Sequence, residues 1–153
     1  MNRALIPVLI FLSCLSVQAQ WTLEQADNAL DDIRDQQYTD LDSATSVCHS
    51  IADFYSREKY SCRHLKAFAI LSSLHIRRSQ YEQALKYIQS ANVAYHDSAC
   101  PEEYLSYIYL ARSNLHLELG EYEQSDSIAH RAIRMYGNEP LDPTLLIKLY
   151  LNL

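Results

Sequence analysis

The 153-residue sequence has little glycine and proline, with two Gly and four Pro. β-Sandwiches and barrels need many tight turns, and phosphate-cradling loops need glycine, so these classes are disfavoured. Basic residues are also few, because 13 Lys and Arg stand against 19 Asp and Glu, for a net charge of −6. Nucleic acids and anionic membranes are bound through clustered Lys and Arg, and neither is expected as a partner. The sequence therefore predicts an all-α chain with an acidic surface.

A long apolar run is found only near the N-terminus, from Ala4 to Leu15. Arg3 precedes it, and Val17-Gln18-Ala19 follows in the small-x-small pattern of a signal-peptide cleavage site. The run is shorter than the ~20 residues of a membrane span. We therefore expect residues 1–19 to be a secretory signal and the protein to be exported to the periplasm or cell envelope.

Two other interpretations of this segment stay open. An uncleaved N-terminal anchor would hold the protein at the membrane. A lipoprotein signal through Cys14 fits less well, because Phe11-Leu12-Ser13 is a poor approach to a lipid-modified Cys. Cleavage after Ala19 would leave enough chain for one domain, and it would make the net charge more negative by one because Arg3 is lost.

One short stretch occurs twice. Leu74-His75 followed by Tyr81-Glu82-Gln83 returns, 41 positions later, as Leu115-His116 followed by Tyr122-Glu123-Gln124. Residues at helical spacing recur at this same repeat offset, which would place each set on one helix face; the sets are Tyr81, Ala84, Ile88 and Ala91, and Tyr122, Ser125, Ala129 and Ala132. Self-similarity at such a period is typical of stacked supersecondary units.

The run from Phe68 to Ala91 resembles a tetratricopeptide repeat (TPR), a helix–turn–helix unit. The apolar, aromatic and small places of that pattern are filled by Phe68, Leu71, Tyr81, Ala84, Ile88 and Ala91. Gly120 and Tyr122 give the usual turn in the next copy, whereas Arg112 departs from the Leu expected there. The repeat offset is longer than the common period of the family and is similar to that of its longer-helix variants.

This resemblance implies a right-handed α-solenoid of antiparallel helix pairs over residues 20–153, with about three repeats at 22–58, 61–96 and 101–137. Helices are expected at 21–37, 41–57, 61–78, 80–95 and 101–119, and a sixth should follow the turn at Gly120 and continue to about Tyr136. An unpaired last helix, 144–153, would start a further repeat at 143–153. That helix is apolar nearly all round, which predicts self-association through it or fraying beyond Pro143.

In the family, the first helices of the repeats line a groove that takes an extended peptide or a partner's helix. Carried over residue by residue, the groove-facing places are Lys66, Ala69, Ser73, Ile76 and Arg77, then Tyr107, Leu110, Asn114, Leu117 and Glu118. Family members that grip a C-terminal carboxylate use a Lys and an Asn on one helix; Leu110 replaces that Lys, so this clamp is not expected. Lys66 and Arg77 beside an apolar groove would suit an acidic-apolar segment.

The other chemistry-bearing residues give weaker indications. Asp27, Asp31, Asp32 and Asp35 lack the glycine and spacing of a calcium loop, and a solvated face of a terminal helix is the simpler interpretation. His75 and His116, equivalent by repeat, fit packing positions. Of the three cysteines beyond the signal, Cys48 fits a buried free thiol, and a bridge between Cys62 and Cys100 is conceivable. No catalytic, metal or cofactor-binding residue is expected.

The resemblance implies a non-enzymatic protein–protein interaction scaffold with a protein or peptide partner. Two forms remain open: a stand-alone periplasmic adaptor, and the sensor or dimerisation segment of a longer signalling protein. Tyr150 to Leu153 resembles the opening of another repeat and favours the second. A membrane role would follow only from an uncleaved N-terminus or from a protein that continues past Leu153. The reading frame downstream of Leu153 would distinguish the two forms.

Overall fold

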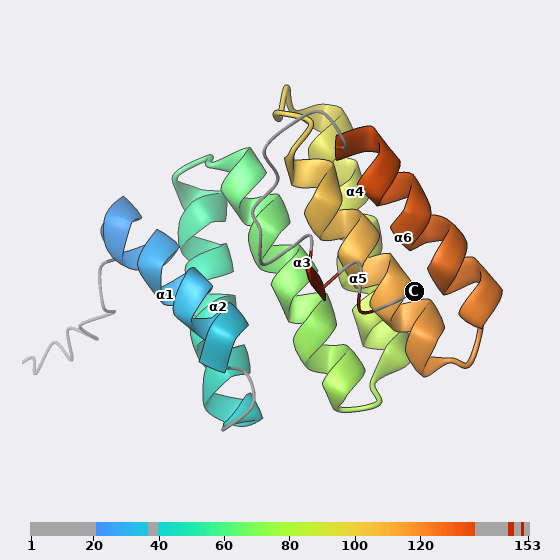
Figure 1. The fold of residues 1–153 in the computed structure, drawn as a ribbon. Coiled ribbons are helices and arrows are strands. Elements are labelled where there is room, and N and C mark those ends of the chain that lie inside the picture. The colour runs from blue at the N-terminus through green and yellow to red at the C-terminus, as the bar shows by residue number, and fades with distance from the viewer. Residues whose placement is uncertain (1–20, 37–39, 137–146, 149–150, 152–153) are drawn as a thin grey trace, which may run out of the picture.

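The computed structural model describes residues 21–36, 40–136, 147–148 and 151, and the regular elements in this part of the chain are all α-helices, without β-strands. In order the helices are α1 (Leu23–Gln36), α2 (Leu41–Arg57), α3 (Ser61–Arg77), α4 (Tyr81–Asp97), α5 (Tyr104–Glu118) and α6 (Tyr122–Tyr136). The prediction of an all-α chain is confirmed (Figure 1). The predicted signal, and most of the predicted last helix, lie outside the described residues.

Three of the helices, α2, α3 and α5, end in the same tight turn. Its central residue, Lys59, Ser79 or Gly120, has a positive φ of 61°, 57° or 76°. The next amide donates to a carbonyl five residues earlier at 2.9 Å, in the pairs Tyr60–Tyr55, Gln80–His75 and Glu121–His116. This pattern is the Schellman motif, which satisfies the last carbonyls of a helix and reverses the chain. The turns after α3 and α5 are related by the repeat offset found in the sequence.

Helix starts are set by local hydrogen bonds. Asp40 caps α2, since its Oδ1 accepts from the amides of Asp42 and Ser43 at 3.1 and 3.0 Å. The predicted start of α5 at Pro101 was wrong by three residues. Residues 101–103 form a separate turn whose carbonyls accept from the amides three positions on, and the α-helix begins at Tyr104. The other predicted helix ends agree to within two residues.

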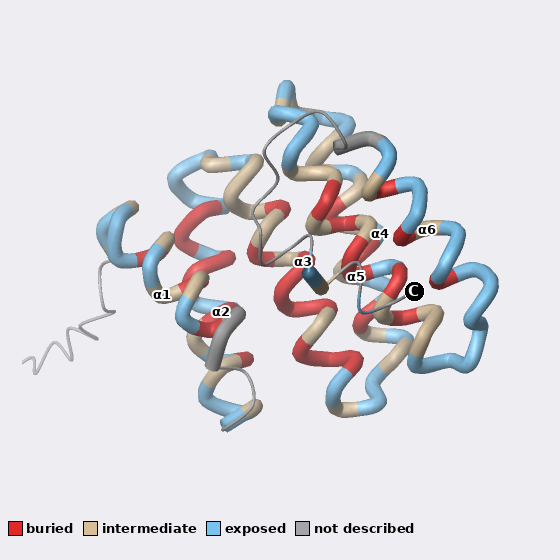
Figure 2. Tube along the Cα trace, viewed as in Figure 1, coloured by how far each residue is buried: buried red, intermediate tan, exposed pale blue. Residues whose placement is uncertain are grey.

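Helix α3 lies at the centre of the packing and contacts α1, α2, α4 and α5. Its two sides contribute to separate cores. Leu71 packs with Leu30 of α1 and Ile51 of α2, whereas Leu65 packs with Ala84 of α4 and Ile108 of α5. A smaller core joins α5 to α6. Figure 2 accordingly shows buried segments along the length of α3, while α1 and α6 at the two ends are more exposed.

Candidate functional site

The predicted groove residues differ widely in accessibility. Ala69, Ile76 and Leu110 are buried, with 4%, 5% and 8% of their surface exposed. They pack between helices because α3 has neighbours on several sides, and so they contribute to the cores. Partly or fully exposed positions are Lys66, Ser73, Arg77, Tyr107, Asn114, Leu117 and Glu118. Of the ten predicted groove residues, only these seven could contact a partner directly.

Lys66 connects the first helices of the three expected repeats. Its Nζ lies 2.7 Å from Oδ1 of Asp31 on α1 and 5.5 Å from the ring centre of Tyr107 on α5. Its side chain is only 16% exposed, so the ion pair and the cation–π contact are partly shielded from water. Lys66 therefore holds α1, α3 and α5 side by side, and an acidic ligand would have to compete with Asp31 for it.

Asp27, one turn before Asp31, makes a second link from α1. Both of its carboxylate oxygens accept from Nε of Arg63 at 2.9 Å, and Oδ1 also accepts from the Tyr55 hydroxyl at 2.6 Å. Burial and this hydrogen bond raise the pKa of Tyr55. The interpretation of the acidic residues of α1 as a solvated face was wrong for Asp27 and Asp31, because they bind α2 and α3. Asp32 is exposed, as expected.

The opposite side of α3 carries a cluster of rings that sequence reasoning did not bring together. The rings of His64 and Phe68 have centroids 4.1 Å apart with their planes tilted by 41°, and the Tyr87 ring of α4 lies 5.8 Å from that of Phe68. Tyr87 also stacks on His75 at 5.2 Å and lies 5.8 Å from His49 of α2. Because consecutive residues of a helix are about 100° apart, Lys66 faces away from both His64 and Phe68. The cluster joins α2, α3 and α4.

His75 and His116, related by the repeat offset, make the same contact. The Nδ1 atom of His75 donates to Oε1 of Gln80 at 2.7 Å, and Nδ1 of His116 lies 2.6 Å from Oε2 of Glu121. Each ring thus binds the residue that precedes the next helix, as expected of packing histidines. His75 is buried, and its Nε2 has no hydrogen-bond partner within the described part of the chain.

Burial lowers the pKa of His64, and the charge of Asp53 offsets this in part. The pKa of His49 is lowered by burial and by proximity to His75, with the same opposing effect of Asp53. Both rings therefore favour the neutral form. Grouped carboxylates, thiols and imidazoles suited to a metal ion are absent from the described ranges.

Two pockets flank this ring cluster and share Lys86. One has a volume of about 510 Å³ and is lined by His64, Phe68, Lys86, Gln89, Ser90, Val93 and Ala94. The other, about 670 Å³, surrounds the turn between α3 and α4 and is lined by His75, Ser79, Gln80, Tyr81, Glu82, Gln83 and Lys86. Neither pocket includes a predicted groove residue.

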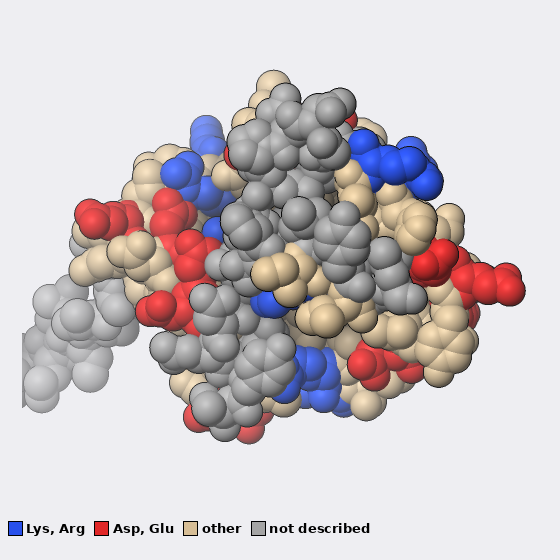
Figure 3. Space-filling model, in the orientation of Figure 1, with Lys and Arg blue, Asp and Glu red and all other residues tan. Residues whose placement is uncertain are grey.

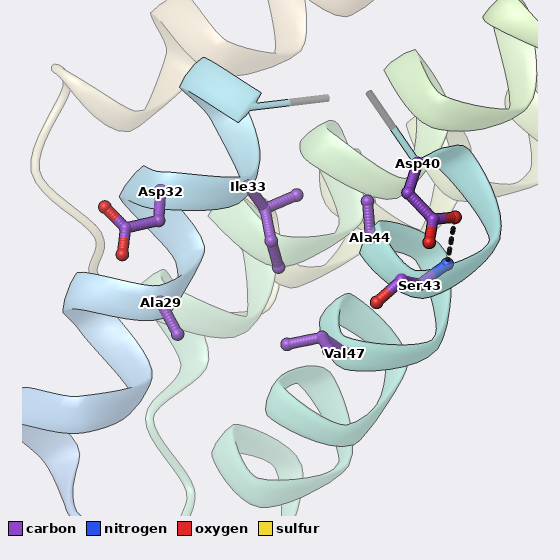
Figure 4. Close-up of a pocket in the computed structure, with 7 residues that line it drawn as sticks. All are labelled: Ala29, Asp32, Ile33, Asp40, Ser43, Ala44 and Val47. Carbon is purple, nitrogen blue, oxygen red and sulfur yellow. Dashed lines mark hydrogen bonds between the residues drawn. The ribbon is translucent and has the colours of Figure 1, made fainter. Parts of the chain in front are cut away.

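A smaller pocket of about 240 Å³ lies between α1 and α2 (Figure 4). Ala29 and Ile33 point towards Ala44 and Val47, while the carboxylate of Asp32 points away. Asp40 lies at its edge but is already engaged in capping α2. The pocket is a gap in apolar packing, without polar groups that converge on a ligand.

Cys62 and Cys100 form a disulfide, with Cα atoms 5.4 Å apart. The bridge ties the first turn of α3 to the connection between α4 and α5, and so fixes the two expected repeats to each other. Cys48 is free and buried, and desolvation raises the pKa of its thiol to about 12. Cys48 is therefore an inert packing residue, as predicted.

The visible face of the molecule carries separated charges (Figure 3). Acidic side chains gather over α1 and at the edge formed by α6, with basic side chains between and above them. None of the helices described is long and apolar enough to cross a membrane. No family model, curated protein or solved structure matches this chain.

Proposed function

We propose that this protein is an exported, non-enzymatic scaffold of the tetratricopeptide type that binds a protein or peptide segment on its first-helix face. About three helix pairs would stack in a right-handed α-solenoid. The observation that carries this proposal is the row of contacts from Asp31 through Lys66 to Tyr107, which aligns α1, α3 and α5. The matching turns after α3 and α5 support repeated units.

The disulfide supports the proposed export, because such bonds persist in oxidising compartments and are rare in the cytosol. The protein would act either as the sensor or dimerisation segment of a longer signalling protein or as a periplasmic adaptor. Self-association through the last helix remains part of this proposal. It is supported by Ile147 and Leu151, which are 58% and 77% exposed.

Lys66 is engaged by Asp31, so the partner's main contacts would be with the accessible positions around Arg77 and Leu117. The partner segment would place apolar side chains against Leu117 and Tyr107 and polar groups near Ser73, Asn114 and Arg77. This composition resembles many protein interfaces, in which tyrosine and arginine are enriched. A short amphipathic helix or an extended strand would satisfy it.

The test uses Arg77→Glu combined with Leu117→Asp. We expect this variant to lose partner binding at least tenfold while keeping its helical circular dichroism and melting temperature, because both positions are accessible. Arg57→Glu, an exposed charge reversal on α2, serves as the control and should bind like the wild type. Equal binding by the wild type and the double variant would refute the first-helix face as the binding surface.

A further inference from the structure

In the helix pairs α3–α4 and α5–α6, the residue at one equivalent position determines whether a neighbouring aromatic ring is covered. By the repeat offset, Tyr109 of α5 corresponds to Phe68 of α3, and Arg131 of α6 corresponds to Ser90 of α4. The guanidinium of Arg131 lies 5.7 Å from the ring centre of Tyr109. Ser90 is too short to cover Phe68 in this way. The α5–α6 pair therefore covers its ring with its own arginine, whereas the equivalent ring of the α3–α4 pair has no such cover.

The open place is the 510 Å³ pocket beside His64 and Phe68. Its base is the tilted ring pair of His64 and Phe68, and Val93 on its rim is 59% exposed, which is unusual for a valine in a helix this well packed. The fold does not require this concentration of rings. In the second pair, His64 and Tyr87 correspond to Leu105 and Ile128, which are not aromatic.

The pocket itself is lined by one charged residue, Lys86, so a cationic occupant would rely on acidic groups nearby. His64 favours its neutral form, so its ring face does not repel a cation. The Asp53 carboxylate of α2 does not line the pocket, but it is exposed and near enough to His64 to oppose the lowering of that pKa. The Lys86 side chain is exposed, so its charged end can extend into solvent and leave the rings accessible. The net charge of −6 further attracts basic partners.

We propose that this pocket, formed by α3 and α4, binds an arginine side chain of a basic segment from a partner protein. The guanidinium would stack on His64 and Phe68 as Arg131 does on Tyr109, and its outer nitrogens would pair with Asp53. Arginine suits the place better than lysine, because its planar group stacks on rings and forms two parallel hydrogen bonds with a carboxylate. This site is on the far side of α3 from the first-helix face and does not depend on the proposed function.

The test titrates the full chain, purified as exported, with three capped pentapeptides that carry Arg, Lys or Glu at the centre of four glycines. Chemical shifts of the Phe68 ring and the Ser90 amide report binding. We expect saturable shifts with the Arg peptide, weaker binding of the Lys peptide by a few-fold, and none with the Glu peptide. Preferential binding of the Glu peptide would assign the pocket to an acidic ligand of Lys86 and overturn the proposal, as would the absence of saturable shifts with Arg.

A variant that fills the pocket from within gives the sharper result. Ser90→Arg should place its guanidinium over Phe68, as that of Arg131 lies over Tyr109. It should weaken the binding of the Arg peptide by about tenfold. Ser90→Ala is the matched control and should bind like the wild type. If Ser90→Arg does not fold, Phe68→Leu keeps the apolar volume without the ring and should weaken binding several-fold. Unchanged affinity in a folded Ser90→Arg or Phe68→Leu variant would overturn the proposal.

Discussion

Single residues at the helix ends illustrate how the chain uses backbone conformation. Lys59, Ser79 and Gly120 occupy the same left-handed position in three equivalent turns. A side chain in this conformation costs about 1 kcal/mol, which glycine avoids. The sequence revealed this turn only where glycine stands, at Gly120. Lys59 and Ser79 give no such signal in the sequence. They can adopt the left-handed conformation because the Schellman hydrogen bonds outweigh its steric cost.

We predict that Gly120→Ala lowers the free energy of unfolding by about 1 kcal/mol. The added methyl group would meet no atom within 4 Å, so the loss would come from the backbone alone. Urea unfolding of the two proteins measures it. Ser79→Gly is the companion variant and should be neutral or stabilising. An unchanged midpoint in Gly120→Ala would contradict the positive φ assigned to this turn.

The ring cluster predicts a loss of stability in mild acid. His49 and His64 favour the neutral form in the folded chain, because their pKa values lie below the ordinary 6.5. Below pH 6.5 the unfolded chain therefore binds more protons than the folded chain, and its free energy falls relative to the folded state. The stability that these residues contribute above pH 6.5 is lost as the pH falls through their folded pKa values.

Melting temperatures at pH 7.5 and pH 5.5 test this prediction. The wild type should melt at a lower temperature in the acid buffer, and His49→Gln with His64→Gln should reduce the difference. His96→Gln, which changes an exposed histidine outside the cluster, should leave the difference unchanged. A double variant with the same pH dependence as the wild type would show that other groups control acid stability.

For the helices, the periodicity of the sequence was a better guide to the structure than the individual polar residues were. The caps and apolar spacing placed five of six helices to within two residues at each end. Contacts between helices were harder to predict, since they depend on which faces meet. Asp27 and Asp31 were expected to be solvated, yet they bind Arg63 and Lys66 across the interface of α1 with α3.

The candidate site was predictable only in part, for the same reason. Of the ten residues that the family pattern assigns to a groove, seven are accessible, whereas Ala69, Ile76 and Leu110 are buried. The side chains of neighbouring helices cover them. The ring cluster was not predicted because its members come from three helices, at spacings that show no pattern along the chain.

Close helix packing gives a prediction for α4. Ala84 and Ala91 are fully buried, so a larger side chain at either position has no space. Ala84→Leu or Ala91→Leu should destabilise the protein by about 1–3 kcal/mol. Glu82→Ala, an exposed change on the same helix, should have an effect within about 0.5 kcal/mol. Similar melting temperatures for all three variants would contradict the packing of α4 against α3 and α5.

The disulfide should contribute strongly to the stability of the interface between the helix pairs. Cys62 and Cys100 are 38 positions apart, and closing a loop of that length stabilises a fold by roughly 2–4 kcal/mol, mainly by restricting the unfolded chain. Cys62→Ala with Cys100→Ala should lower the free energy of unfolding by that amount. A thiol titration of the unreduced, unfolded wild type should find Cys48 alone reactive among the cysteines beyond residue 19. Three reactive thiols would contradict the bridge.

For the whole molecule, the structure suggests two surfaces with different chemistry on opposite sides of α3. The first-helix face has its charges largely paired, with tyrosine, serine and asparagine around them. The far side has the partly exposed rings of His64 and Phe68, which line a pocket. An adaptor or sensor could use both at once, holding one partner segment on each side. The two surfaces share no residue, so variants can separate their contributions.

Site-specific photo-crosslinking in the cells that produce the protein tests the central claim most directly. A photoreactive phenylalanine analogue at Ser73 of α3 or Leu117 of α5 would lie on the first-helix face, and the same group at Arg57 of α2 would not. We predict one adduct of discrete mass, with the same partner, from positions 73 and 117 and none from position 57. Adducts from position 57 alone, or from none of the three positions, would contradict the binding scaffold proposed for this protein.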